Sequence, residues 1–357
     1  MPAIPVQTRL QDALTRESDK MVEEGVASEE EVRRVMREIF GVPLEDSAEN
    51  TNKDRLILLE VMKGEIQTLS PDGRMSGTLI SGLTSMPDAV QIDNRPGKGH
   101  IYWTNMGTFS SENNGFISRA NLADGSNITT IVPVGVTRTP KQLVLDAEGD
   151  KLYWCDREGC RIMRCNLDGS NVETLYASTT PGPDDVEERK NPRKWCVGLV
   201  LDKSRGLMYW TQKGANKGWC GSILRASIEL PPGSQPHSRH DVEVLFSGMP
   251  EPIHLEFHAG FLYWTDRGDP PFGNTLNRAE VGWALDAKRA PRGPGKEWVI
   301  AERYHEAMGL TIDRAGGKIY VCDLSGTVWV TELDGSNKRA LQREVGTFTG
   351  VTFHPGA

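Results

Sequence analysis

The sequence lacks a long apolar run, and no stretch approaches the roughly 18 residues that a membrane-spanning helix needs. It also lacks a basic excess, since 41 Lys and Arg stand against 49 Asp and Glu, a formal net charge of -8. That balance gives no electrostatic footprint for nucleic acid. The first 30 residues are polar and charged, without the apolar segment of a secretory signal. We therefore expect a cytoplasmic protein that binds neither membrane nor nucleic acid.

Cysteine is scarce, and its spacing argues against zinc. The chain has six cysteines, and no two form a C-x-x-C pair. Reduced, partly buried thiols are the expected state in a reducing compartment. The sequence also contains no P-loop, no G-x-S-x-G elbow and no H-E-x-x-H helix. Nucleotide hydrolysis, nucleophilic-serine hydrolysis and zinc proteolysis therefore have no motif to support them.

What the sequence does contain is a repeat. The tetrapeptide Tyr-Trp-Cys-Asp at 153–156 has four altered copies, which begin at Tyr102, Tyr209, Tyr263 and Tyr320. Successive copies start between 51 and 57 residues apart. A period of that length indicates one supersecondary unit copied along the chain.

The clearest copy predicts four short strands, over 141–146, 152–156, 161–167 and 173–176. Alternating apolar residues, β-branched and aromatic content, and Gly/Asp turns between the segments favour four antiparallel strands per unit. The Tyr-Trp pairs are predicted to pack in the core. The aspartates that follow them, Asp156, Asp266 and Asp323, are predicted to bond backbone in turns between units.

Five tetrapeptides do not account for the two ends of the chain. Residues 58–61 and 65–69 fit strands two and three of a further unit that has no first strand of its own. Residues 349–354 fit a first strand, after which the sequence stops. Joining the two ends completes a sixth unit and removes exposed strand edges. The sequence thus predicts an all-β, six-bladed β-propeller with a velcro closure.

The tetrapeptides, the strand I-x-R-x-N-L-D-G-S and the velcro closure resemble the YWTD propeller, the class B repeat domain of low-density lipoprotein receptors. This resemblance covers residues 55–357 and implies the same fold. Residues 1–54 are predicted to be a helical extension and linker, since apolar residues recur there at helical spacing. The first 35 or so residues resemble the C-terminal helical segment of 3-hydroxyacyl-CoA dehydrogenases. By that analogy, the helices would pair two chains as a homodimer.

If the family's geometry holds, one face of the ring carries the starts of the first strands. Aligning those strands gives two sets of residues at the channel mouth. The first set is Asp88, Lys141, Val197, Glu251, Met308 and Thr349. The second set is Met86, Thr139, Trp195, Met249, Glu306 and Thr347. Their mixed chemistry favours a binding site over a purely structural ring.

Three expanded loops on the same face each carry an aromatic residue, Phe109, Trp219 or Phe272. Long loops on a rigid scaffold concentrate binding residues, so we expect these rings to wall a small-molecule pocket. The donors predicted to be catalytic are His305, Lys141 and Arg157. The remaining predicted substrate-binding residues are Asp88, Trp195, Glu251, His254, Glu306 and Met308.

Three functions remain open from the sequence. The first is a cofactor-independent enzyme that binds a small, largely apolar metabolite, such as a cyclase or isomerase of natural-product biosynthesis. Hetero-Diels–Alder cycloaddition is one form, because it needs an aromatic-walled pocket and one or two donors that polarise a carbonyl. The second is a protein-interaction propeller. The third is a lactone or ester hydrolase of gluconolactonase type, with a cation near Asp88, Glu251 and Glu306. We expect no resident metal or cofactor.

Overall fold

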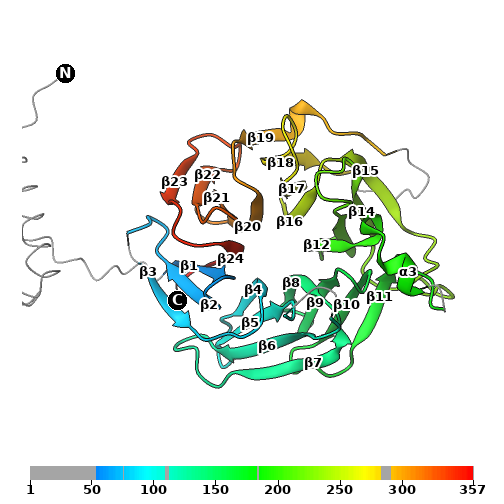
Figure 1. Ribbon diagram of the computed structural model, residues 1–357, viewed down its shortest axis with the longest axis horizontal. Helices are drawn as coiled ribbons and strands as arrows, with labels where there is room; N and C mark the ends of the chain where they lie inside the picture. The colour runs from blue at the N-terminus through cyan, green and yellow to red at the C-terminus, as the bar shows by residue number, and fades with distance from the viewer. Residues whose placement is uncertain (1–53, 75, 109–111, 183–184, 283–290, 357) are drawn as a thin grey trace, which may run out of the picture. The chain divides into compact units, whose positions relative to one another are not determined.

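Strands pair into six four-stranded antiparallel blades around a central axis in this computed structural model (Figure 1). The structure describes residues 54–356 except 75, 109–111, 183–184 and 283–290. Residues 54–356 form one compact unit. The predicted N-terminal helices, and the dimer through them, lie outside the described residues. Within the described residues, no helix has the length and apolar character needed to cross a bilayer.

Each blade contributes its first strand to the channel wall, and the other three follow outward. Blade 1 comprises β24 (Phe348–His354), β1 (Arg55–Glu60), β2 (Glu65–Leu69) and β3 (Ser76–Ile80). Blade 2 comprises β4 (Pro87–Asp93), β5 (His100–Asn105), β6 (Gly115–Asn121) and β7 (Thr129–Thr137). Blade 3 comprises β8 (Pro140–Asp146), β9 (Lys151–Asp156), β10 (Arg161–Asn166) and β11 (Glu173–Ala177).

The other three blades repeat this order. Blade 4 comprises β12 (Cys196–Asp202), β13 (Leu207–Gln212), β14 (Gly221–Ser227) and β15 (Glu243–Met249). Blade 5 comprises β16 (Pro252–His258), β17 (Phe261–Asp266), β18 (Thr275–Glu280) and β19 (Val299–Glu302). Blade 6 comprises β20 (Ala307–Asp313), β21 (Lys318–Asp323), β22 (Val328–Glu332) and β23 (Arg339–Gln342).

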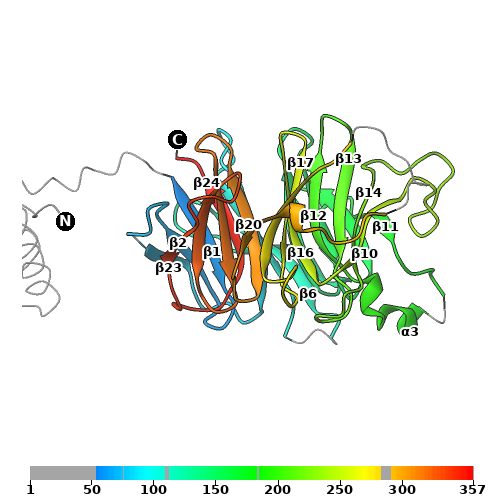
Figure 2. The same cartoon turned by 90° about the horizontal axis from the view of Figure 1, so that it is seen from above.

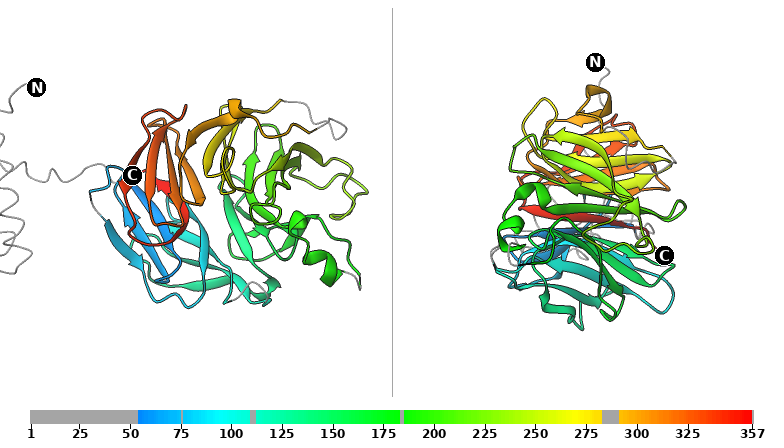
Figure 3. Two further views of the ribbon diagram at one scale, coloured as in Figure 1. Left: turned by 45° about the horizontal axis from the view of Figure 1, so that its top comes forward. Right: turned by 90° about the vertical axis from the view of Figure 1, so that its right-hand side faces the viewer.

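In the described part of the chain, three short helical segments lie between strands. The helix α3 (Asp185–Arg189) and the 3-10 turn η1 (Pro192–Lys194) connect β11 to β12, and the 3-10 turn η2 (Lys296–Trp298) precedes β19. Helix α3 lies at the periphery of the ring, outside β11 (Figures 1 and 3). The strands run from one face of the ring to the other (Figure 2). We call the face where the inner strands begin the strand-start face, and the opposite one the strand-end face.

The predicted ring closure is confirmed. β24, from the C-terminal end of the chain, pairs antiparallel with β1 in a register that runs from Arg55 opposite His354 to Glu60 opposite Phe348. One blade is therefore built from both ends of the propeller sequence. This pairing leaves no open edge at the junction.

The repeated tetrapeptide builds the interior of the blades. Its four tryptophans, Trp103, Trp154, Trp210 and Trp264, are fully buried, as predicted. The third position links neighbouring blades: the Thr211 hydroxyl accepts a bond from Gly198 N (2.7 Å) and donates to the Ile253 carbonyl of the next blade (2.9 Å). In blade 3 the Cys155 thiol takes this place and donates to the Gly198 carbonyl. A small side chain with a donor is therefore needed there.

The fourth-position aspartates also behave as predicted. Asp156 accepts a hydrogen bond from the backbone N–H of Thr139 (2.9 Å), and Asp266 accepts one from Glu251 (3.0 Å). Asp323 accepts one from Thr327 (3.0 Å). These carboxylates therefore hold the connections that lead into or out of the blades. The cysteines are all free thiols, and burial raises the pKa of Cys160 and Cys165 to about 12. Such thiols are unreactive, in line with the structural role expected.

Close approach of the inner strands requires glycine in three blades. A Cβ on Gly350 would lie 2.4 Å from the Asp88 carbonyl oxygen, and one on Gly198 would lie 2.1 Å from that of Ile253. Gly309 is equally crowded, by the backbone of Val351 at 2.8 Å. In these three blades, the inner strands therefore approach a neighbouring strand closely at their third residue.

We predict that Gly350→Val destabilises the propeller, because its side chain would force β24 away from β4. The expected loss is about 1–3 kcal/mol of unfolding free energy, as for other overpacked sites. Urea denaturation measures it. Gly293→Val is the matched control, because a Cβ at Gly293 meets no atom within 4 Å. Equal stability of the two variants would contradict the close packing of the inner strands.

Candidate functional site

A ring of six buried residues narrows the channel at the strand-start face. It consists of the second residue of each inner strand, namely Asp88, Lys141, Val197, Ile253, Met308 and Thr349, none more than 8% exposed. Val197, Ile253 and Met308 pack together from three blades. Lys141 forms an ion pair with Asp88, and its Nζ lies 2.9 Å from the Met106 sulfur. Asp88 and Lys141 are thus in contact, and Met308 occupies the same strand position in another blade, within a packed layer.

The ring corrects one prediction from the strand alignment. Glu251 was assigned to this layer because Glu256 was taken as the closing residue of its strand. β16 instead runs from Pro252 to His258, so Ile253 occupies the position. Glu251 precedes the strand and replaces Met249 in the outer layer, with Trp195 and Glu306. The alignment failed because Glu256 was matched with the aspartates that close other inner strands, such as Asp146 and Asp202, whereas β16 closes two residues later, with His258.

The outer layer is a network of paired charges around Trp195. The Arg157 guanidinium and the Lys213 ammonium each lie 5.5 Å from the centre of the indole. Lys213 also bonds Glu251 (3.0 Å), which accepts a second bond from Arg267 (2.6 Å). Burial opposes ionisation of Glu251, but Arg267 and Lys213 outweigh it and lower the pKa. Burial also disfavours the charged form of Lys213, and it therefore lowers the pKa of that side chain.

Lys213 and Arg267 were missed by the sequence reasoning, although both follow a repeated tetrapeptide in the expanded loops. The signal available was a basic residue directly after the fourth position, as also at Arg157. Arg157 itself pairs with Glu158 at 2.7 Å. The predicted donors Lys141 and Arg157 therefore already have anionic partners.

The aromatic loop residues lie at the solvent boundary of this face. Trp219 is 40% exposed and meets Phe272 edge-on, with ring centres 6.1 Å apart. Phe109 lies outside the described residues. Trp219 and Lys217 both have φ of +52°, and Glu306 has φ of +58°. Such backbone is costly for residues other than glycine and recurs at binding sites.

Two histidines were predicted near this face. His305 is exposed, and its backbone N–H donates to Asp323 (3.3 Å). His254 is the third residue of β16, directly below the ring, and its backbone N–H donates to the Thr265 hydroxyl. Burial lowers the pKa of His254 to about 3, so its ring is neutral near pH 7. His254 therefore cannot supply a cation to the channel.

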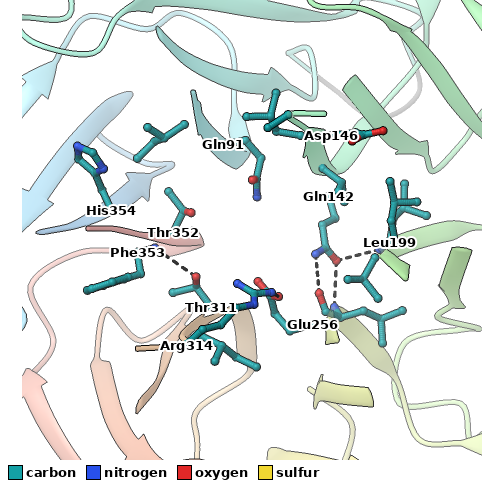
Figure 4. A pocket seen from close by; sticks show the side chains of 18 of the residues that line it. Gln91, Gln142, Asp146, Leu199, Glu256, Thr311, Arg314, Thr352, Phe353 and His354 are labelled. Atoms are coloured by element: carbon teal, nitrogen blue, oxygen red, sulfur yellow. Dashed lines mark hydrogen bonds and ion pairs between the residues drawn. The ribbon is translucent and has the colours of Figure 1, made fainter. Parts of the chain in front are cut away.

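A cavity of about 760 Å³ lies at the opposite, strand-end side of the channel (Figure 4). Its apolar wall includes Val144, Val200 and Phe353. Gln142 spans the channel, donating to the Leu255 carbonyl at 2.8 Å and accepting from Leu199 N at 2.9 Å. The Gln142 side chain thus separates the cavity from the buried ring.

The polar wall of the cavity includes a carboxyl group, Glu256. It pairs with Arg314 at 3.0 Å, and its side chain is 15% exposed. Burial raises the pKa of Glu256, and the Arg314 charge only partly opposes this. The Gln91 side chain also lines the cavity, and its amide has no hydrogen-bond partner among the described residues. A partly buried carboxyl with a raised pKa in a cavity is typical of a functional site.

None of these cavity residues was a sequence candidate. Gln91, Val144, Val200, Glu256, Thr311 and Thr352 share the fifth position of their inner strands. A column at that position would have found them, since it mixes acid, amide, hydroxyl and apolar groups. The sequence reasoning considered only the strand-start end.

The carboxylates considered for a metal do not converge. Asp88 pairs with Lys141, Glu251 with Lys213 and Arg267, and Glu306 approaches Lys217 at 3.8 Å. Each negative charge is met by a cation of the chain. Across the described residues, no three His, Cys, Asp or Glu side chains gather as a metal site.

Comparison with known proteins shows the family. No protein-family model matches the chain. The chain is 42% identical over 296 residues to "Low-density lipoprotein receptor-related protein 1" of Pyricularia oryzae. The match covers 81% of this chain and 92% of that protein. The chain belongs to the six-bladed YWTD propeller family of low-density lipoprotein receptor class B repeats.

The name of a second fungal relative refers to 3-hydroxyacyl-CoA dehydrogenases, the family that the first 35 or so residues resemble. The YWTD propeller chain is 39% identical over 298 residues to "3-hydroxyacyl-CoA dehydrogenase-like protein LAM1" of Cochliobolus heterostrophus. The match covers 82% of this chain and 61% of that longer protein. Among solved structures, the nidogen/laminin complex contains a chain with a TM-score of 0.61 at 20% identity, covering 84% of this chain and 98% of that one. This likeness shows the fold alone.

We predict that Asp88→Asn lowers the unfolding free energy by about 3–5 kcal/mol, because it leaves the Lys141 charge buried without a counterion. The double variant Asp88→Asn, Lys141→Gln should recover much of the loss. Asp269→Asn is the matched control, since Asp269 pairs with Lys217 at 3.3 Å but is 56% exposed. That exposed pair should contribute less than about 1 kcal/mol. Similar losses at both sites, measured by urea denaturation, would contradict a desolvated pair at the ring.

Proposed function

We propose that this propeller is a cofactor-independent enzyme that binds a small, largely apolar metabolite in the strand-end cavity. The observation that carries the proposal is Glu256, a carboxyl with a raised pKa in a cavity of about 760 Å³. This volume is within the range of small-molecule sites. Val144, Val200 and Phe353 would contact the apolar body of the substrate.

The proposed chemistry is cyclisation or isomerisation, with hetero-Diels–Alder cycloaddition as one form. Protonated Glu256 would donate a hydrogen bond to a substrate carbonyl and lower the energy of the polarised transition state. The Gln91 amide would orient a second polar group, and the rigid walls would hold the reacting atoms together. No external oxidant or reductant is needed, because bonds only rearrange within the bound molecules.

This proposal gives the role of hydrogen-bond donor to Glu256, whereas the sequence analysis gave it to residues of the strand-start face. Lys141 and Arg157 pair with Asp88 and Glu158, which are both little exposed, so each would have to leave a partly or fully buried ion pair to contact a substrate. The partner of Glu256, Arg314, is 55% exposed, and such a pair is weaker. The His305 side chain is exposed to solvent at the strand-start face. The catalytic roles of these three residues remain predictions, which substitution of each residue would test.

A second candidate function is binding of another protein at the strand-start face. The exposed Trp219 ring beside Phe272 favours it, because exposed aromatics are frequent in interfaces. The two proposals use opposite faces of the propeller. Substitutions on each face can therefore separate them.

The protonation of Glu256 can be tested without a substrate. Its pKa in the folded chain lies above the usual 4.5, so the folded state holds the proton more tightly than the unfolded one. That stabilisation is complete below pH 4.5 and is lost as pH rises through the raised pKa. Glu256→Gln mimics the neutral carboxyl and should not show this loss. The stability of the wild type relative to Glu256→Gln, from urea denaturation, should therefore fall with rising pH. A constant difference would refute the raised pKa.

Activity is tested by incubating the full chain with small-molecule extracts of fungal cultures and following composition by mass spectrometry. We expect one compound, or a pair, to give a product of unchanged total composition. Glu256→Gln should slow the conversion at least tenfold, a loss typical of general acid catalysis. Gln91→Trp should also slow it, because the indole fills the cavity.

Trp219→Ala is the control for that experiment, because it changes only the opposite face. Conversion by this variant should match the wild type. If the Glu256 and Gln91 variants convert as fast as the wild type, the cavity is not the site. If neither the wild type nor any variant converts a compound in the extracts, the enzyme proposal fails.

A further inference from the structure

A second cavity lies at the rim of blade 3, between β10, β11 and the segment that carries α3. Its volume is about 490 Å³. We call it the rim pocket and define it by six of its lining residues, Arg138, Arg161, Thr174, Thr179, Arg189 and Gln235. It shares no lining residue with the strand-end cavity. The rim pocket is therefore a separate site.

Three guanidinium groups line the rim pocket, and they are close enough to affect one another. Burial, followed by the positive charges of Arg138 and Arg161, lowers the pKa of Arg189. Among the described lining residues, Asp185 is the one acid. A cluster of like charges at a cavity is unfavourable unless an anion or a buried carboxylate compensates it.

Two carboxylates compensate two of the three arginines. Arg189 forms an ion pair with Asp185. Arg161 bonds Asp156 through Nε (3.0 Å) and also donates to the Val136 carbonyl (2.8 Å). The other oxygen of Asp156 accepts the backbone N–H groups of residues 138 and 139. Both carboxylates are therefore already engaged.

The third arginine of the rim pocket is Arg138, and none of these contacts involves its guanidinium group. Its backbone is fixed by the bond from its N–H to Asp156 (3.0 Å) and by a bond from Gly115 N to its carbonyl (3.0 Å). Its guanidinium has no hydrogen-bond or ion-pair partner among the described residues. The side chain is half-buried at the pocket wall. A half-buried cation held at a cavity without a counterion suits an anionic ligand.

We propose that the rim pocket binds a small molecule through a phosphate or carboxylate group held by Arg138, with Arg161 and Arg189 beside it. The guanidinium plane can donate two parallel bonds to either oxyanion. Thr174, Thr179 and Gln235 also line the pocket, and their hydroxyl and amide groups would bind the rest of the ligand. The volume accommodates a metabolite-sized molecule. This proposal is independent of the enzyme proposal, since the two cavities are distinct.

Isothermal titration of the full chain with inorganic phosphate, and separately with acetate, tests the rim pocket. We expect saturable binding of at least one anion at low ionic strength, and the tighter of the two identifies the group preferred. Arg138→Gln should weaken this binding at least tenfold, because a charge-assisted bond is lost. The variant should fold normally, since no protein contact of the guanidinium is removed.

Two further variants separate a local charge effect from a general one. Arg74→Gln removes an arginine whose side chain is 84% exposed, and should leave anion affinity unchanged. Asp185→Asn removes the acid that competes for Arg189, so it should tighten binding severalfold. Absence of saturable binding by both anions, or equal affinity of Arg138→Gln and wild type, would overturn the proposal.

Discussion

Pairing of β24 with β1 is the constraint on which the rest of the propeller depends. It joins segments from the two ends of residues 54–356 and fixes six blades around one axis. Six inner strands must then share a narrow channel, which explains why Gly198, Gly309 and Gly350 have no room for a side chain. The same crowding places the third-position hydroxyl or thiol of one blade within reach of the next. The repeated motif thus stabilises both the blade and the ring.

The two ends of the channel differ in how their polar groups are satisfied. At the strand-start face, Asp88 meets Lys141, and Glu251 meets Lys213 and Arg267. These carboxylates are buried, and each is neutralised within its own layer. At the strand-end face, the cavity retains the Gln91 amide, which has no hydrogen-bond partner among the described residues, and the Glu256 carboxyl, whose pKa is raised by burial. A ligand can bind the Gln91 amide without breaking an existing pair, and the partner of Glu256, Arg314, is a largely exposed side chain. For this reason our proposed site is at the strand-end face.

The rim pocket follows from the long connection between β11 and β12. Trp195 anchors that connection by donating to the Arg189 carbonyl at 2.7 Å, while its ring stacks below Arg157 and Lys213. One tryptophan therefore links the charged layer at the channel to the arginines at the rim. Four residues of this connection, Thr179, Pro181, Asp185 and Arg189, line the rim pocket.

Much of the scaffold was predictable because its signals are local and repeated. Tyr-Trp pairs, turn glycines and the half-blades at the two ends give strand order and blade number without knowledge of contacts. The site was less predictable. Glu251 was placed one layer too deep, because the closing residue of β16 is His258, and the ends of a strand cannot be read from residue type alone. Lys213 and Arg267 were overlooked because their importance lies in a shared partner.

The sequence by itself determined the all-β class, the six blades, the closure and the buried aromatic core, since each depends on periodicity and on apolar side chains leaving water. Only the tertiary structure decided which charges neutralise one another and which cavity keeps unpaired groups. The physical reason is that ion pairing and desolvation depend on distances between blades. Residues such as Asp88 and Lys141 are 53 positions apart in the chain, and only the closed ring brings them together.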